Sequence, residues 1–183
     1  MTNCIIETFV KTKSDYPYGH SIKSVQKNRI AYNYNEDFKL NFLQISSVDE
    51  VEIQEEMYDF VKGAIVLKVG SVIVVDWECW DEIISLWLKL YLNARRTSFK
   101  INYDLDYCES YGKVTFEPDE SEDIIELYLN KSYKATVRRK ELLKEVVRGA
   151  DEFFNFLWKI RPELKDELKW LLPDLKEDVK NYL

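Results

Sequence analysis

The amino-acid sequence predicts a single α+β domain, residues 1–183, built around a mostly antiparallel sheet of about six to eight strands. Two main helices, about residues 80–94 and 139–160, are expected to pack on this sheet, followed by short C-terminal helices. The length of 183 residues suits one domain, and 46% hydrophobic residues are enough for a core. Turn-forming residues also separate short β-prone runs from the two helix-periodic segments.

The first β-prone run is residues 4–11, in which β-branched and aromatic side chains dominate. Two further runs, 29–34 and 38–45, are separated by three polar residues, a spacing that suits a hairpin loop. We therefore expect a first strand followed by a hairpin.

A second hairpin is predicted for residues 64–69 and 72–76, two continuous apolar runs. They are joined by Gly70-Ser71, and glycine at the first of two loop residues is typical of a type II′ turn. Because apolar residues occupy both parities of these runs, we expect a central hairpin covered on both faces, at least in part.

Residues 47–62 carry two conflicting patterns. Ser47 and Glu50 fit a capping box, and Gly63 fits the position that follows a helix. An edge strand is also compatible, because four apolar residues share one parity: Val51, Ile53, Met57 and Val61. Helix and strand both stay open for this segment.

The second half of the chain alternates between helix and strand patterns. A wide apolar arc over residues 80–94 predicts a helix buried on more than one side. An antiparallel meander is then expected, with turns at 109–111, 118–123 and 131–132 between strands at 98–105, 112–117, 124–130 and 133–137.

The longest helical period covers residues 139–160, where apolar residues recur at helical spacing. Pro162 suits the first position of a new helix, predicted for 163–172 and ended by Pro173. A last amphipathic segment, 175–183, completes the short C-terminal helices.

Several kinds of functional site are excluded by composition. A single histidine cannot build a zinc site from two or three imidazoles, and the three cysteines form no CxxC pair. The five glycines contain neither a GxGxxG nor a GxxxxGK[ST] motif. The sequence therefore indicates no catalytic residue, no metal site and no cofactor, and it favours a protein that is not an enzyme.

Negative charge is concentrated in residues 41–93, whose ten acidic and three basic residues account for the whole net charge of −7. Such a region repels nucleic acid and steers a basic partner towards it, although it is also compatible with the solvated face of an ordinary acidic protein. A tryptophan beside these acids would suit an interface anchor. The candidate partner-binding residues, named here the acidic face, are Asp49, Glu50, Glu52, Glu55, Glu56, Asp59, Trp77, Glu78, Asp81 and Glu82.

Two smaller charged clusters have different interpretations. Four carboxylates within residues 119–123 lack the spacing and glycine of an EF-hand, so a charged hairpin turn is expected there. The basic residues 138–140 lie at the start of a helix, where the dipole does not favour cations, and they suit a contact with a small anion or a partner.

The cellular location follows from the cysteines and from hydropathy. Three widely separated cysteines suit a reducing cytosol, and the first residues have no basic or apolar signal-peptide region. The longest apolar-rich stretch, 80–92, contains charged residues and is too short to cross a bilayer. We expect a cytoplasmic chain with no membrane segment and no nucleic-acid partner, and the sequence does not indicate an oligomeric state.

The run Gly63-Ala64-Ile65-Val66-Leu67-Lys68-Val69, a short hairpin, and then Trp80-Asp81-Glu82-Ile83-Ile84-Ser85-Leu86-Trp87 resembles a group of small acidic bacterial proteins. Members of this group are uncharacterised domains or immunity proteins of polymorphic toxin systems. The resemblance covers about residues 50–160 and has no diagnostic motif, so it implies no site residue. It implies a protein that binds and blocks a toxin in the cytosol.

Three functions are compatible with these observations. The first is a non-enzymatic, immunity-like binding protein that uses the acidic face against a basic protein partner. The second is an enzyme with a carboxylate-based site, which would require a pocket holding two or more acids with shifted pKa values. The third is a phage-type anti-defence protein whose acidic surface imitates nucleic acid.

Overall fold

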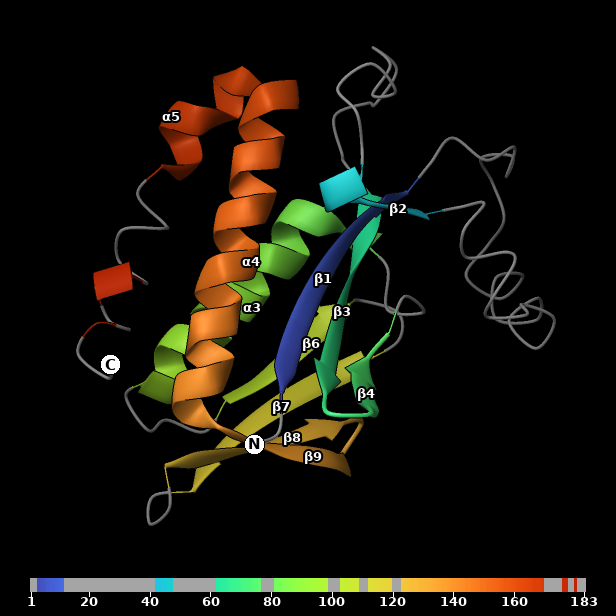
Figure 1. The fold of residues 1–183 in the computed structure, drawn as a ribbon, viewed down its shortest axis with the longest axis vertical. Helices are drawn as coiled ribbons and strands as arrows, with labels where there is room; N and C mark the ends of the chain where they lie inside the picture. The colour runs from blue at the N-terminus through green and yellow to red at the C-terminus, as the bar shows by residue number, and fades with distance from the viewer. Residues whose placement is uncertain are drawn as a thin grey trace, which may run out of the picture.

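The computed structural model describes residues 3–11, 42–47, 62–76, 81–98, 103–108, 112–119, 123–169, 176–177 and 180 (Figure 1). These residues form antiparallel strands and two long helices, which confirms the predicted α+β class. The prediction of one continuous sheet was wrong, because the described strands form two separate sheets, named sheet A and sheet B. Turn signals reveal which neighbouring strands pair, but they do not reveal where one sheet ends and another begins.

Sheet A contains the strands of the first half of the chain, in the order β2-β1-β3-β4, with β5 paired to β3. All of its pairs are antiparallel, and β1 runs beside β3 from Cys4 opposite Val69 to Val10 opposite Gly63. The strands are β1 (Cys4–Lys11), β2 (Phe42–Gln44), β3 (Lys62–Val69), β4 (Val72–Val75) and β5 (Asp81–Glu82). The predicted first strand is therefore confirmed.

The β3–β4 hairpin has its turn at Gly70-Ser71, as predicted, and Gly70 adopts a φ of 59° that glycine accepts without strain. Residues 63–67 of β3 are all buried, so the expected covering of both faces is confirmed for this strand. In β4, both faces are covered only in the second half of the strand, because Val72 and Ile73 are 39% and 38% exposed.

Sheet B is the predicted meander, with the order β6-β7-β8-β9. The last turn was placed one residue too late: it lies at Asn130-Lys131, and Ser132 already pairs with Leu129. Asn130 and Lys131 have φ values of 54° and 64°, the positive pair that a type I′ turn requires. The strands are β6 (Tyr103–Cys108), β7 (Gly112–Asp119), β8 (Ile124–Leu129) and β9 (Ser132–Arg138).

The first long helix, α3 (Ile83–Ser98), begins and ends later than the predicted 80–94. It begins later because Asp81 and Glu82 pair with β3 as a short strand. It ends at Ser98, so the first strand of the meander starts at Tyr103 instead of residue 98.

The second long helix, α4 (Arg139–Ile160), has the predicted bounds. After it, Pro162 opens a short 3-10 helix, η5 (Pro162–Leu164), which continues into α5 (Lys165–Leu168). The short C-terminal helices are thus confirmed as far as residue 169.

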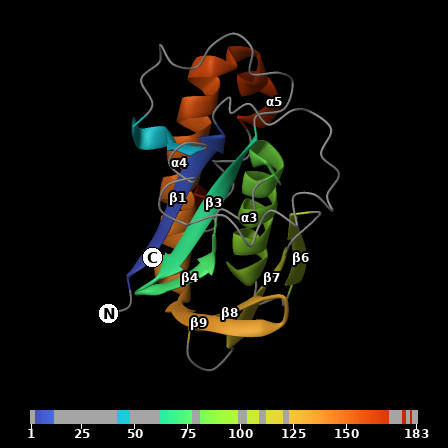
Figure 2. The same cartoon turned by 90° about the vertical axis from the view of Figure 1, so that its right-hand side faces the viewer.

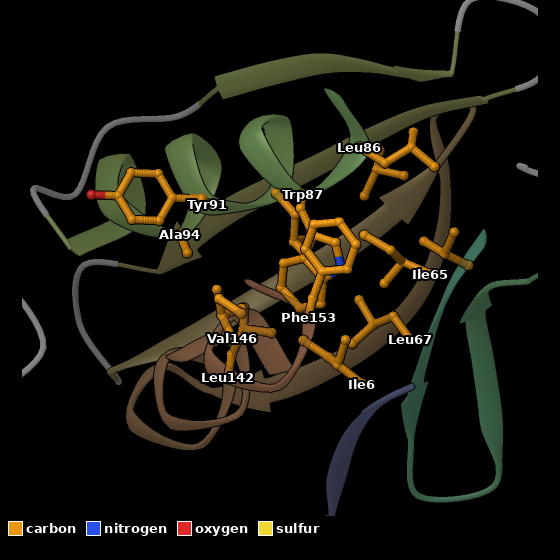
Figure 3. Close-up of a cluster of buried hydrophobic side chains, with 14 of the residues drawn as sticks. Ile6, Ile65, Leu67, Leu86, Trp87, Tyr91, Ala94, Leu142, Val146 and Phe153 are labelled. Atoms are coloured by element: carbon orange, nitrogen blue, oxygen red, sulfur yellow. The ribbon is translucent and has the colours of Figure 1, made fainter. Parts of the chain in front are cut away.

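The core lies where the two helices meet both sheets, and buried residues from all four elements form one cluster. In Figure 3, Trp87 of α3 lies against Phe153 of α4, close to Ile6 of β1. The two rings stack with centroids 5.9 Å apart and an interplanar angle of 14°. Gly149 permits this packing, because a Cβ atom there would lie 2.7 Å from the Trp87 ring. The two helices therefore approach each other over an aromatic stack.

Several predictions lie outside the described residues. The hairpin at 29–34 and 38–45 is described only from residue 42, and the helix-or-strand alternative for 47–62 falls almost wholly on residues whose structure is not described. Within the described part of the chain, no helix is long and apolar enough to cross a membrane.

Candidate functional site

Of the ten residues predicted for the acidic face, only Asp81 and Glu82 belong to the described part of the structure. The other eight lie in two stretches, 49–59 and 77–78, outside it. The structure therefore tests where these stretches attach to the fold, but not the surface that they form.

Glu82 has a defined role at the start of helix α3. Its two carboxylate oxygens accept the backbone N–H groups of Ile84 and Ser85 at 2.9 and 2.6 Å. These N–H groups have no partner within the helix, and a negative charge is favourable at this end of the helix dipole. Part of the hydrogen-bonding capacity of Glu82 is thus used inside the chain.

The short strand β5 brings the ends of the two acidic stretches together. Lys62 pairs with Glu82, and Gly63 pairs with Asp81. The first acidic stretch, 49–59, ends three positions before Lys62. The second acidic stretch includes Trp77 and Glu78, continues to residue 82 and thus ends in β5 itself. Both stretches therefore attach to the same end of sheet A, although about twenty residues separate them along the chain.

A second group of charged residues, on helix α4, lies against the outer edge of β1. Strand β2 covers this edge only from Phe9 to Lys11. At Ile6, the Glu145 carboxylate accepts the backbone N–H at 3.1 Å, and the Arg148 guanidinium donates to the backbone C=O at 2.5 Å. The two side chains supply the acceptor and the donor that a neighbouring strand would supply.

This group is held together by further charge-assisted hydrogen bonds. Arg148 donates to Glu145 at 2.8 Å and to Glu152 at 2.9 Å, which aligns all three side chains along one face of the helix. The i, i+3 and i, i+4 spacing is visible in the sequence. The contact of Glu145 with Ile6, which lies 139 positions earlier in the chain, is not visible in the sequence.

The Cys4 thiol lies beneath the same group and is buried. Burial, together with the negative charges of Glu145 and Glu141, raises the pKa of this thiol to about 12. A thiol with such a pKa is almost wholly protonated near neutral pH and is a poor nucleophile. Cys4 is therefore a core residue.

The predicted basic cluster at 138–140 contains a buried residue. Arg139 is 2% exposed, its Nη2 donates to the Asp119 carbonyl at 3.5 Å, and its Nε lies 3.7 Å from the Asp123 carboxylate. Its backbone N–H also donates to the Asp123 carbonyl at 3.0 Å. Arg139 thus ties the β7–β8 turn to the start of helix α4 instead of facing an anion or a partner.

The outer face of sheet B is the part of the described surface that the sequence did not single out. Its inner residues, such as Ile125 and Leu127 of β8, are buried in the core. Alternate residues point away from the core and leave a patch named here the tyrosine–carboxylate face. It consists of Glu117, Glu126, Tyr128, Tyr133, Thr136 and Arg138.

Hydrogen bonds fix the two tyrosines of this face. The Tyr128 hydroxyl donates to the Glu126 carboxylate at 2.7 Å, and the hydroxyls of Tyr133 and Thr136 lie 2.8 Å apart. The bond to Glu126 and the nearby negative charges of Glu126 and Glu117 raise the pKa of Tyr128 to about 12. The hydroxyl of Tyr128 thus stays protonated and in place near neutral pH.

Within the described residues, no group of three or more histidine, cysteine, aspartate or glutamate side chains could hold a metal ion. No protein-family model matches the chain, and neither a curated protein nor a solved structure is similar to it.

Proposed function

We propose that the chain is a non-enzymatic, immunity-like binding protein that holds a basic protein partner on its acidic face. The observation that carries the proposal is the pairing of β5 with β3, which attaches both acidic stretches to one end of sheet A. Residues 49–59 contain six acidic and no basic residues, and residues 76–82 contain four acidic and no basic residues.

Charge segregation of this kind has a direct consequence for association. Residues outside 41–93 carry equal numbers of acidic and basic side chains, so the field of the molecule is dominated by one region. A one-signed region raises the association rate of an oppositely charged partner and makes that rate sensitive to salt. The acidic face therefore orients the partner and raises its association rate, and Trp77 is the candidate for an anchor that slows dissociation.

The experiment is affinity capture from the source cells, followed by binding kinetics with the captured partner. One variant replaces Glu52, Glu55, Glu56 and Asp59 by lysine. The control replaces four exposed acids of the C-terminal part by lysine, which changes the net charge equally: Glu163, Asp166, Glu167 and Glu177.

We expect a basic partner whose association rate falls about tenfold or more with the first variant and changes little with the control. The salt dependence of the rate should also weaken in the first variant. An acidic partner, or a partner that binds all three proteins at the same rate, would contradict the proposal.

A further inference from the structure

The tyrosine–carboxylate face lies at the opposite end of the molecule from the start of β3, where Asp81 and Glu82 pair with it. Figures 1 and 2 show the start of β3 at one end and strands β8 and β9 at the other. Any ligand of this face therefore contacts a surface separate from strand β5, and its binding does not depend on the proposed function.

The carboxylates of this face are arranged unfavourably for the isolated chain. Glu117 and Glu126 are register partners on the neighbouring strands β7 and β8. Like charges directly opposite each other destabilise a sheet. A cation bound between these two carboxylates would remove this repulsion.

The aromatic rings beside these carboxylates present fixed surfaces. Tyr128 and Tyr133 meet edge to face with centroids 5.8 Å apart and an interplanar angle of 75°. Tyr133 is 54% exposed although its hydroxyl is engaged with Thr136. Because both rings are already held, binding a ligand to them costs little side-chain entropy.

We propose that the tyrosine–carboxylate face binds an arginine side chain of a protein partner. A guanidinium can stack on the Tyr133 ring while its N–H groups donate to the carboxylates of Glu117 and Glu126. Lysine offers a compact charge without the planar stacking surface, so it suits the same site less well. The site thus selects a planar cation.

The test is an NMR titration of the full chain with a capped pentapeptide, Gly-Arg-Gly-Arg-Gly. In this peptide, one residue separates the two guanidinium groups. Two matched peptides carry lysine or citrulline, the latter a neutral isostere of arginine, in place of arginine. We expect the ring resonances of Tyr128 and Tyr133 to shift and saturate with the arginine peptide, to shift less with the lysine peptide, and to stay unchanged with the citrulline peptide.

Two variants locate the binding. Tyr133→Leu removes the exposed ring, and the double variant Glu117→Gln with Glu126→Gln removes both charges while keeping hydrogen-bonding groups. Each should weaken binding at the tyrosine resonances about fivefold or more. The control, Asp166→Asn with Glu167→Gln, removes two exposed carboxylates of the C-terminal part and should leave the affinity unchanged.

The charge-reversal variant of residues 52–59 separates this proposal from the proposed function. It should still bind the peptide at the tyrosine resonances, whichever way the partner capture turns out. The inference is overturned if these resonances do not saturate, if citrulline shifts them as strongly as arginine, or if the double variant binds normally. A shift that depends on protein concentration without peptide would instead identify a second copy of the chain as the occupant.

Discussion

Sheets A and B differ in whether side chains cover the parts of the sheet that would otherwise be exposed. The open edge of β1 in sheet A is closed by Glu145 and Arg148, which bind the backbone of Ile6. The outer face of sheet B is left open, and it presents Tyr133 with more than half of its surface exposed.

The difference indicates what each region contributes. Backbone groups of an uncovered edge can pair with any other chain, so covering them protects the fold and its solubility. Exposed aromatic side chains contribute little to stability, and they are enriched where proteins bind partners. Substitutions in sheet A and its helices should therefore change stability, whereas those on the outer face of sheet B should change binding.

The largest effect is expected for Trp87→Ala, which removes one ring of the buried stack with Phe153. We expect the free energy of unfolding to fall by about 3–5 kcal/mol, because a large cavity remains in the core. Urea denaturation followed by circular dichroism measures this loss. The half-buried Trp158 is the matched position, and Trp158→Ala should cost clearly less. Equal losses would mean that burial of the Trp87 ring in the stack with Phe153 does not determine the size of the loss.

A smaller loss, about 1–3 kcal/mol, is expected for Glu145→Ala, which leaves the partly buried N–H of Ile6 without its acceptor. Glu145→Gln keeps an acceptor oxygen and should recover part of the stability. Glu152→Ala is the control, because Glu152 also pairs with Arg148 but makes no hydrogen bond to the described residues of β1. If the free energy of unfolding falls equally in all three variants, the hydrogen bond between Glu145 and Ile6 contributes nothing beyond the salt bridges with Arg148.

Lys131→Gly should raise the free energy of unfolding by about 0.5–1 kcal/mol, because glycine adopts positive φ without the strain that a Cβ atom causes. The equivalent change at the second turn position of the β3–β4 hairpin, Ser71→Gly, should not stabilise, since φ of Ser71 is not positive. Thermal unfolding of the two variants distinguishes these outcomes. A stabilised Ser71→Gly variant would contradict the turn assignment.

The smallest change in stability, within about 0.5 kcal/mol, is expected for Tyr133→Leu, because this side chain is mostly solvated. The same variant should bind the arginine peptide about fivefold or more weakly, so one substitution distinguishes an effect on stability from an effect on binding. Urea denaturation measures the stability. A loss comparable to that of Trp87→Ala would show that the outer face of sheet B is structural.

Local patterns in the sequence predicted much of the secondary structure. Helix α4 was predicted with its observed bounds because its apolar period continues without interruption, and the β3–β4 turn was predicted from Gly70. The β8–β9 turn was misplaced by one residue because Asn130, a residue type that tolerates positive φ, was assigned to the end of the strand instead of the first turn position. Local rules succeed where the local preference and the fold agree.

Long-range contacts account for the features that were not predicted. The start of α3 depends on the pairing of Glu82 with Lys62, and the division into two sheets depends on which strand edges meet. The contact of Glu145 with Ile6 and the pairing of Glu117 with Glu126 likewise join residues that no short window of sequence contains. Most of the acidic face lies outside the described residues, so it stays a prediction.

The connectivity of sheet A also sets an order for folding. Strands β6 to β9 are joined by short turns and can pair soon after they form, whereas β1 must wait for β3 across residues 12–61. Bringing β1 and β3 together across that long segment of sequence costs chain entropy before any β1–β3 hydrogen bond compensates for it. We therefore expect sheet B and helix α4 to gain protection from amide hydrogen exchange early in refolding, and β1 to gain it last.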